Sequence, residues 1–157
     1  MNIFVLHADP VKAAQHQCDA HVVKMSTESA QILSSVARGL LVDVGYKRTH
    51  EYHPCTIWAG ASLSNFTWLL NHGFALCTEY TYRYSKSHDA RIVLNELFAA
   101  RGALAMIDPG LTPFVQAMPE KYQGPNAVKA YRAFYQGEKG FAAWKKKRPP
   151  PPWWRSA

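Results

Sequence analysis

Apolar residues recur every three or four positions over the first part of the chain. The pattern begins after Asp9 and Pro10, which suit the N-cap and the first position of a helix, and it continues to about Gly39. Its members are Val11, Ala14, Cys18, Val22, Met25, Ser29, Leu33 and Val36. This spacing predicts one helix from residue 10 to about residue 39, with Cys18 in the core.

Three further helices are predicted downstream. A strongly apolar segment from about Thr56 to Tyr84 indicates a long central helix, with a bend expected at residues 71–73. Another helix is expected at roughly 89–106, capped by Asp89, and a last one at 126–144. Prolines and glycines mark residues 109–125 as an irregular connection. No alternating strand pattern is present, so the predicted fold class is all-α.

The length favours a single domain. The chain has 157 residues, 48% of them hydrophobic, which is enough for one core. We expect a helical domain over 1–148 and a tail rich in proline and tryptophan over 149–157. Trp153 and Trp154 in the tail are expected to dock, because exposed indoles are unfavourable.

No apolar run is long enough for a membrane span, and the first residues do not resemble a secretory signal. We therefore expect a cytoplasmic protein that does not contact a membrane. Its three cysteines are expected to be reduced, because they cannot all pair within one chain.

Charge and aromatic content favour nucleic acid as the partner. Lysine and arginine number 18 against 11 acidic residues, a net charge of +7, and 13% of residues are aromatic. Cations suit phosphates and flat rings suit bases, although a generally basic protein would have the same composition. The densest cationic segments contain Lys47, Arg48, His50 and His53 in a loop, and Lys145, Lys146, Lys147 and Arg148 near the end. We expect both to contact the phosphates of duplex DNA, because cationic side chains there release counterions from the duplex. The alternative for the second segment is a solvated, flexible end.

Chemistry-bearing side chains share one face of the first helix. Gln17, His21, Lys24 and Glu28 follow helical spacing, and His21 and Lys24 are expected to be exposed. An imidazole, an amine and a carboxylate together could supply an acid, a base and a phosphate contact, although an ordinary solvated helix face explains them equally well.

A metal site is not expected. His16 and His21 are five residues apart, whereas two helical zinc ligands favour a separation of four. We expect neither a metal nor another cofactor. The loop residues His50, His53 and Cys55 stay open as an alternative ligand set.

Short motifs in three parts of the chain resemble the pyrimidine dimer DNA glycosylase (endonuclease V) family of phage repair enzymes. They are Ala14-Gln15-His16, the basic loop ending at Pro54 before a helix carrying Phe66, Leu70 and Glu79, and YRAFYQG at 131–137. The resemblance implies a compact all-α bundle with the N-terminal segment against the first helix and an irregular C-terminal third. It also implies a cationic surface that bends DNA and exposes a base, in the cytoplasm of the host cell if the protein is phage-encoded.

The resemblance further implies a mechanism, from which this sequence departs. In the family an α-amine, uncovered by removal of the initiator methionine, attacks the sugar C1′, and a glutamate on the first helix assists. Asn2 is too large for efficient methionine removal, so the amine here belongs to Met1. Val22 or Val23 stands where the glutamate is expected, and the nearest carboxylates are Asp19 and Glu28.

We therefore expect a DNA glycosylase or abasic-site lyase with an altered catalytic set. The candidate catalytic residues are Met1, Asp19, His21, Lys24 and Glu28. Arg83 is a further expected phosphate contact. The alternatives are a phage-type base-modifying transferase on the same scaffold and a non-catalytic DNA-binding module, which the missing glutamate favours.

Overall fold

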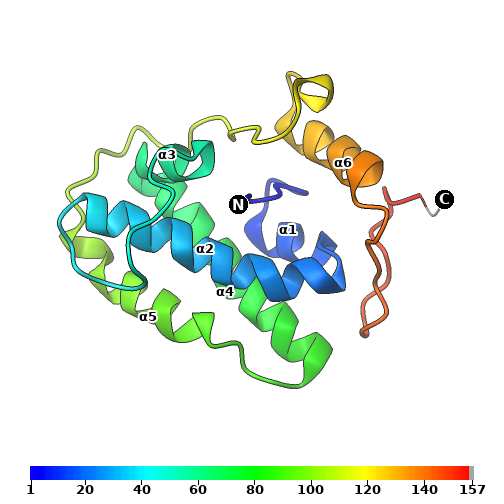
Figure 1. Cartoon of the computed structure of the whole chain (residues 1–157), viewed down its shortest axis with the longest axis horizontal. Helices are drawn as coiled ribbons and strands as arrows, with labels where there is room; N and C mark the ends of the chain where they lie inside the picture. Colours follow the sequence, from blue (N-terminus) through cyan, green and yellow to red (C-terminus); the bar gives the residue numbers. More distant parts are fainter. Residues whose placement is uncertain (156–157) are drawn as a thin grey trace.

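The computed structural model describes residues 1–155, and helices are their only regular secondary structure (Figure 1). The helices are α1 (Pro10–His16), α2 (Asp19–Gly39), α3 (Pro54–Gly60), α4 (Leu63–Tyr84), α5 (Ala90–Ala100) and α6 (Ala127–Glu138), with 3-10 turns at Arg101–Ala103 and Glu120–Tyr122. The predicted all-α class is confirmed. None of the helices formed by residues 1–155 combines the length and apolar character needed to cross a bilayer.

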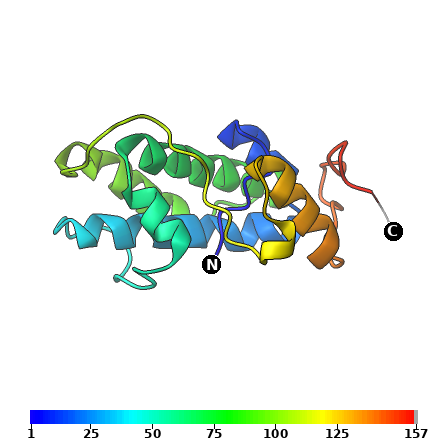
Figure 2. The ribbon, with the colours of Figure 1, turned by 90° about the horizontal axis from the view of Figure 1, so that it is seen from above.

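The core is built on α2 and α4, which pack extensively against each other and run along the length of the molecule (Figure 2). α1 packs on α4, whereas α3 and α5 each contact both long helices. Fully buried side chains of the two long helices include Val22, Leu33, Phe66, Leu69 and Leu76. Burial of these apolar surfaces is the main stabilising contribution to the fold.

The N-terminal segment is part of this core rather than a free end. Residues 3–6 are buried, and the Phe4 ring lies 4.6 Å from the ring of His21 on α2 and 6.2 Å from that of Phe134 on α6. Asn2 fixes the backbone, because its Oδ1 accepts hydrogen bonds from the Ile3 and Phe4 N–H groups. The segment therefore joins α6 to the first long helix.

The predicted single helix from residue 10 to residue 39 is wrong at one point, since it is interrupted at Gln17 and Cys18. The Asp9 cap, the Pro10 start and the end at Gly39 are confirmed. At the break, the Arg83 guanidinium donates to the Gln17 carbonyl, and the Cys18 N–H donates to the Tyr135 hydroxyl. Distant side chains thus satisfy backbone groups that a continuous helix would pair internally.

The second predicted helix is also divided, between α3 and α4. The break lies at Ala61 and Ser62, where the Ser62 hydroxyl accepts from the Asn65 N–H and caps α4. No bend occurs at residues 71–73, which lie inside α4. Gly73 instead permits close packing, because a Cβ there would lie 3.0 Å from Leu94 and 3.3 Å from Ser29.

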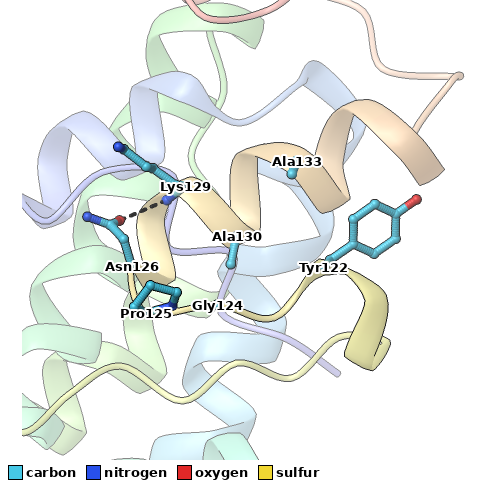
Figure 3. A pocket seen from close by; sticks show the side chains of 7 residues that line it. All are labelled: Tyr122, Gly124, Pro125, Asn126, Lys129, Ala130 and Ala133. Atoms are coloured by element: carbon cyan, nitrogen blue, oxygen red, sulfur yellow. Dashed lines mark hydrogen bonds between the residues drawn. The ribbon is translucent and has the colours of Figure 1, made fainter.

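The last two helices are shorter than predicted. α5 ends at Ala100, and Asp89 precedes it without a side-chain capping bond. α6 begins after Asn126, whose side chain accepts from the Lys129 N–H (Figure 3), and ends at Glu138. Gly137 is accommodated near its end because the Tyr122 ring covers that position, leaving no room for a Cβ.

The C-terminal segment folds back beside α6. The Trp153 indole N–H donates to His16 Nδ1 at 3.1 Å, and the Arg132 guanidinium lies 5.4 Å from the centre of the Trp153 ring. Trp154 packs on Trp144, with ring centroids 5.0 Å apart. The expected docking of the paired indoles is confirmed.

Candidate active site

The amino terminus lies against a carboxylate of α2. The Met1 nitrogen is 3.9 Å from Glu28 Oε2, and the same oxygen accepts the Asn2 N–H at 2.9 Å. The other oxygen, Oε1, lies 3.4 Å from Lys24 Nζ, one helical turn earlier. An amine and a carboxylate therefore meet at a largely buried position, where the Glu28 side chain is only 15% exposed.

A pocket of about 320 Å³ opens beside this pair. Its charged and polar wall includes Glu28, Lys24 and Lys139, and its aromatic wall is formed by Phe4, Phe134 and Phe141. Lys139 Nζ lies 4.7 Å from the centre of the Phe134 ring. Flat apolar faces next to cations suit a planar, polar ring such as a nucleobase.

His21 also lines the pocket, but it is buried rather than exposed as predicted. Its ring is stacked on Phe4, and its Nδ1 lies 2.7 Å from the Tyr135 hydroxyl. Burial lowers the pKa of His21 to about 4, and the charges of Lys139 and Lys24 add to the effect. The imidazole is therefore neutral at physiological pH.

His53 lies close enough to the amino terminus to be affected by its charge. It caps α3, with its Nδ1 accepting the Cys55 N–H at 3.1 Å. Burial lowers the pKa of His53, and the charge of the amino terminus lowers it further, whereas Glu28 opposes these effects. The sequence predicted this imidazole as a phosphate contact or an alternative metal ligand, and the structure brings it near the amine and Glu28.

Two other predicted site residues form a separate, buried cluster. Arg83 is 3% exposed and donates to Asp19 at 3.1 Å, to Glu79 at 3.0 Å and to two backbone carbonyls. The second Asp19 oxygen accepts the Lys145 N–H at 2.7 Å. The position of the two side chains lends no support to Arg83 as a phosphate contact or Asp19 as a substitute catalytic carboxylate, because their polar groups are paired inside the protein.

The two cationic segments contain both exposed side chains and side chains that are paired within the protein. Lys47, Arg48 and His50 are exposed, as are Lys145, Lys146 and Lys147. Arg48 forms an ion pair with Glu51, and Arg148 binds both oxygens of Glu79. Exposure leaves the lysines able to reach a ligand, whereas Arg148 fastens the C-terminal segment to α4.

A second pocket, of about 330 Å³, lies between α6 and the segment before it (Figure 3). Tyr122, Asn126 and Lys129 are among its lining residues, and Lys129 is the one charged side chain there. The pocket brings no acid–base pair together. The residues at positions 1–155 also form no group of three or more His, Cys, Asp or Glu side chains able to hold a metal ion.

Sequence reasoning missed the wall that α6 and the following turn contribute. Phe134 was inside the aromatic motif at 131–137, but Lys139 and Phe141 carried no local signal. Their place in the pocket depends on backbone hydrogen bonding between Asp19 and Ala143, which are distant in sequence.

Comparison with known proteins gives one match. The family model described as pyrimidine dimer DNA glycosylase matches residues 1–92, more than half of the chain. No curated protein and no solved structure matches. The matched part contains Met1, His21, Lys24, Glu28 and His53, whereas the α6 wall lies outside it.

Proposed function

Because the chain belongs to the pyrimidine dimer DNA glycosylase family, we propose that it excises a pyrimidine from duplex DNA and cleaves the resulting abasic site. The observation that carries the proposal is the amino terminus facing Glu28 at the mouth of an aromatic pocket. The amine is the nucleophile, and Glu28 is its proton acceptor and donor.

The Met1 lone pair forms a bond to the sugar C1′ while the glycosidic bond breaks. The electrons of that bond leave with the pyrimidine, which then takes up a proton. The attached amine loses a proton to Glu28, and its remaining lone pair expels the ring oxygen O4′, which receives that proton. The product is a protonated imine between Met1 and C1′.

Strand cleavage follows from the imine. Loss of a proton from C2′ to a base supplies the electron pair that forms the C2′–C3′ double bond and expels the 3′ phosphate. The positively charged imine favours this loss because it withdraws electrons from C2′.

Glu28 takes the role of the assisting glutamate, for which the sequence has valine at the expected position. Counting along the helix placed the family glutamate at Val22 or Val23, but Val22 is buried in the core. Glu28 lies more than one turn further along and contacts the amino terminus. The missing glutamate was the argument for a non-catalytic binding module, and the contact of Glu28 with the amino terminus supports the catalytic alternative.

Phosphates are bound by the exposed cations. Lys47 and Arg48 in the loop before α3, together with Lys145, Lys146 and Lys147, supply charge outside the pocket. Lys24 is 68% exposed and stands at the pocket itself, where it holds the phosphate next to the attacked sugar.

Borohydride trapping tests the proposal. Duplex DNA with one abasic site is incubated with the protein and reduced, which converts an imine into a stable amine. We expect a covalent adduct on the N-terminal peptide, absent when the α-amine is acetylated. Intact mass of the protein identifies whether Met1 or, after its removal, Asn2 carries the amine. No adduct with abasic or dimer-containing DNA would exclude the imine mechanism.

A further inference from the structure

A hydrogen-bond chain from the protein interior reaches His21. The Cys18 N–H donates to the Tyr135 hydroxyl at 3.0 Å, and that hydroxyl lies 2.7 Å from His21 Nδ1. With its oxygen accepting from Cys18, the hydroxyl still has its one proton to donate, and Nδ1 lies within reach of it. A neutral imidazole that accepts at Nδ1 carries its own proton on Nε2.

The His21 ring is also held in position. Phe4 stacks on it at 4.6 Å with an interplanar angle of 18°, and the edge-on ring of Phe141 lies 5.5 Å away. Among residues 1–155, nothing forms a hydrogen bond with Nε2, although the side chain lines the pocket beside Glu28. When Nδ1 accepts from Tyr135, the Nε2–H of His21 is therefore an oriented donor at the pocket, and no other group among residues 1–155 binds it.

We infer that Tyr135 donates to His21 Nδ1 and that His21 Nε2–H donates to the C2 carbonyl oxygen of the pyrimidine that leaves C1′, and thereby stabilises the departing base. This inference rests on the proposed function. When the C1′–N1 bond breaks, its electron pair spreads from N1 onto this oxygen. A preformed donor aimed at the oxygen stabilises charge that develops only during departure.

The same contact selects the class of base. Pyrimidines have a carbonyl next to the nitrogen that is bonded to the sugar, whereas purines have no carbonyl on either carbon next to that nitrogen. A neutral imidazole can donate its one N–H to a developing anion. Burial and the neighbouring lysines keep the ring in this form.

Two substitutions at His21 and two DNA substrates test the role. His21→Phe keeps an aromatic ring on Phe4 but removes the donor, and His21→Gln retains an amide N–H near the position of Nε2. Each variant is assayed on a duplex with a cyclobutane pyrimidine dimer, which requires base departure, and on a duplex with an abasic site, which does not.

We expect His21→Phe to cleave the dimer substrate roughly 100-fold more slowly, the size of effect seen when one preformed donor is removed. His21→Gln should recover most of that loss. Both variants should form the borohydride adduct on abasic DNA as fast as the wild type, which also shows that their fold and nucleophile are intact.

Other results would overturn the inference in recognisable ways. Equal losses on both substrates would make His21 structural, and an unchanged rate for His21→Phe on the dimer would show that the donor is not used. If the wild-type protein forms the borohydride adduct on abasic DNA but excises no pyrimidine from the dimer substrate, this inference is overturned, whereas the proposed cleavage of abasic sites still holds. A wild-type protein that traps neither substrate removes the proposed function itself and this inference with it.

Discussion

The backbone nitrogen of Asn2 lies 2.9 Å from Oε2 of Glu28, although 26 residues separate them in the chain. Within the same carboxylate, Oε1 faces Lys24. Glu28 therefore fixes the start of the chain at the pocket and is also the nearest proton acceptor for the terminal amine. Its two contacts connect the fold to the proposed chemistry.

Replacing Glu28 by glutamine should slow cleavage at a pyrimidine dimer by about 10²- to 10⁴-fold, the usual contribution of general acid–base catalysis. The amide is close in size and can still accept the Asn2 N–H, so the fold should be retained. Single-turnover cleavage measures the effect, with exposed Glu96→Gln as the matched control. Equal rates for the two variants would remove Glu28 from the mechanism.

Arg83→Met should destabilise the protein by about 3–5 kcal/mol, because it removes the buried cation that Asp19 and Glu79 share and leaves Glu79 with Arg148 as its remaining cation. Urea unfolding measures the loss, and Lys86→Met, at an exposed position just after α4, is the control. A variant of normal stability with weakened DNA binding would instead support the phosphate contact that the sequence predicted for Arg83.

Local signals in the sequence predicted the helix content well. Asp9 and Pro10 start α1 as expected, and Cys18 is buried, because capping and amphipathic spacing act within a few residues. The break after Gln17 had no local signal. It depends on Arg83 and Tyr135, which reach it from α4 and α6.

The site was predictable only in part, for the same reason. Helical spacing placed His21, Lys24 and Glu28 on one helix face, and they do line one pocket. Helical spacing does not show which of these three side chains lies beside the amino terminus. For this reason Glu28 was not recognised as the partner of the amine. Lys139 and Phe141 enter the pocket through tertiary contacts alone.

Stability should fall as the pH drops from about 6.5 toward about 4. The pKa values of His21 and His72 are both lowered to about 4 by burial, so in this range the unfolded chain binds protons that the folded protein excludes. Each histidine then contributes a loss of about 1.4 kcal/mol per pH unit, and its stabilising effect is complete above pH 6.5. Urea unfolding at several pH values, with NMR titration of both imidazoles, provides the check. Imidazole titration near pH 6.5 in the folded protein would contradict it.

Binding to duplex DNA should weaken steeply with salt. If about four phosphates are neutralised, log affinity should fall with log salt with a slope of roughly −3 to −4. Lys47→Ala should reduce the magnitude of that slope by about one, whereas Lys47→Arg should preserve it. Fluorescence anisotropy at several salt concentrations measures the slope. Binding that is insensitive to salt would argue against exposed lysines as phosphate contacts.

The last prediction separates the two amines that stand beside Glu28. α-Amines as a class have a pKa of about 8 and lysine side chains about 10.4, so more of an α-amine is neutral and nucleophilic near pH 7. Lys24 is also 68% exposed, and its Nζ lies 3.4 Å from Oε1 of Glu28. Lys24→Met should therefore keep the borohydride adduct on the N-terminal peptide while binding DNA more weakly.

Two controls for the Lys24→Met experiment distinguish a lysine that attacks the sugar from one that only binds phosphate. Lys12→Met removes an exposed lysine from α1, outside the pocket lining, and should leave the yield of adduct unchanged. Selective acetylation of the α-amine should abolish the adduct even though Lys24 is intact. An adduct that maps to Lys24, or that disappears in Lys24→Met but survives acetylation, would reverse the roles, because only a nucleophilic lysine could form the imine without the terminal amine.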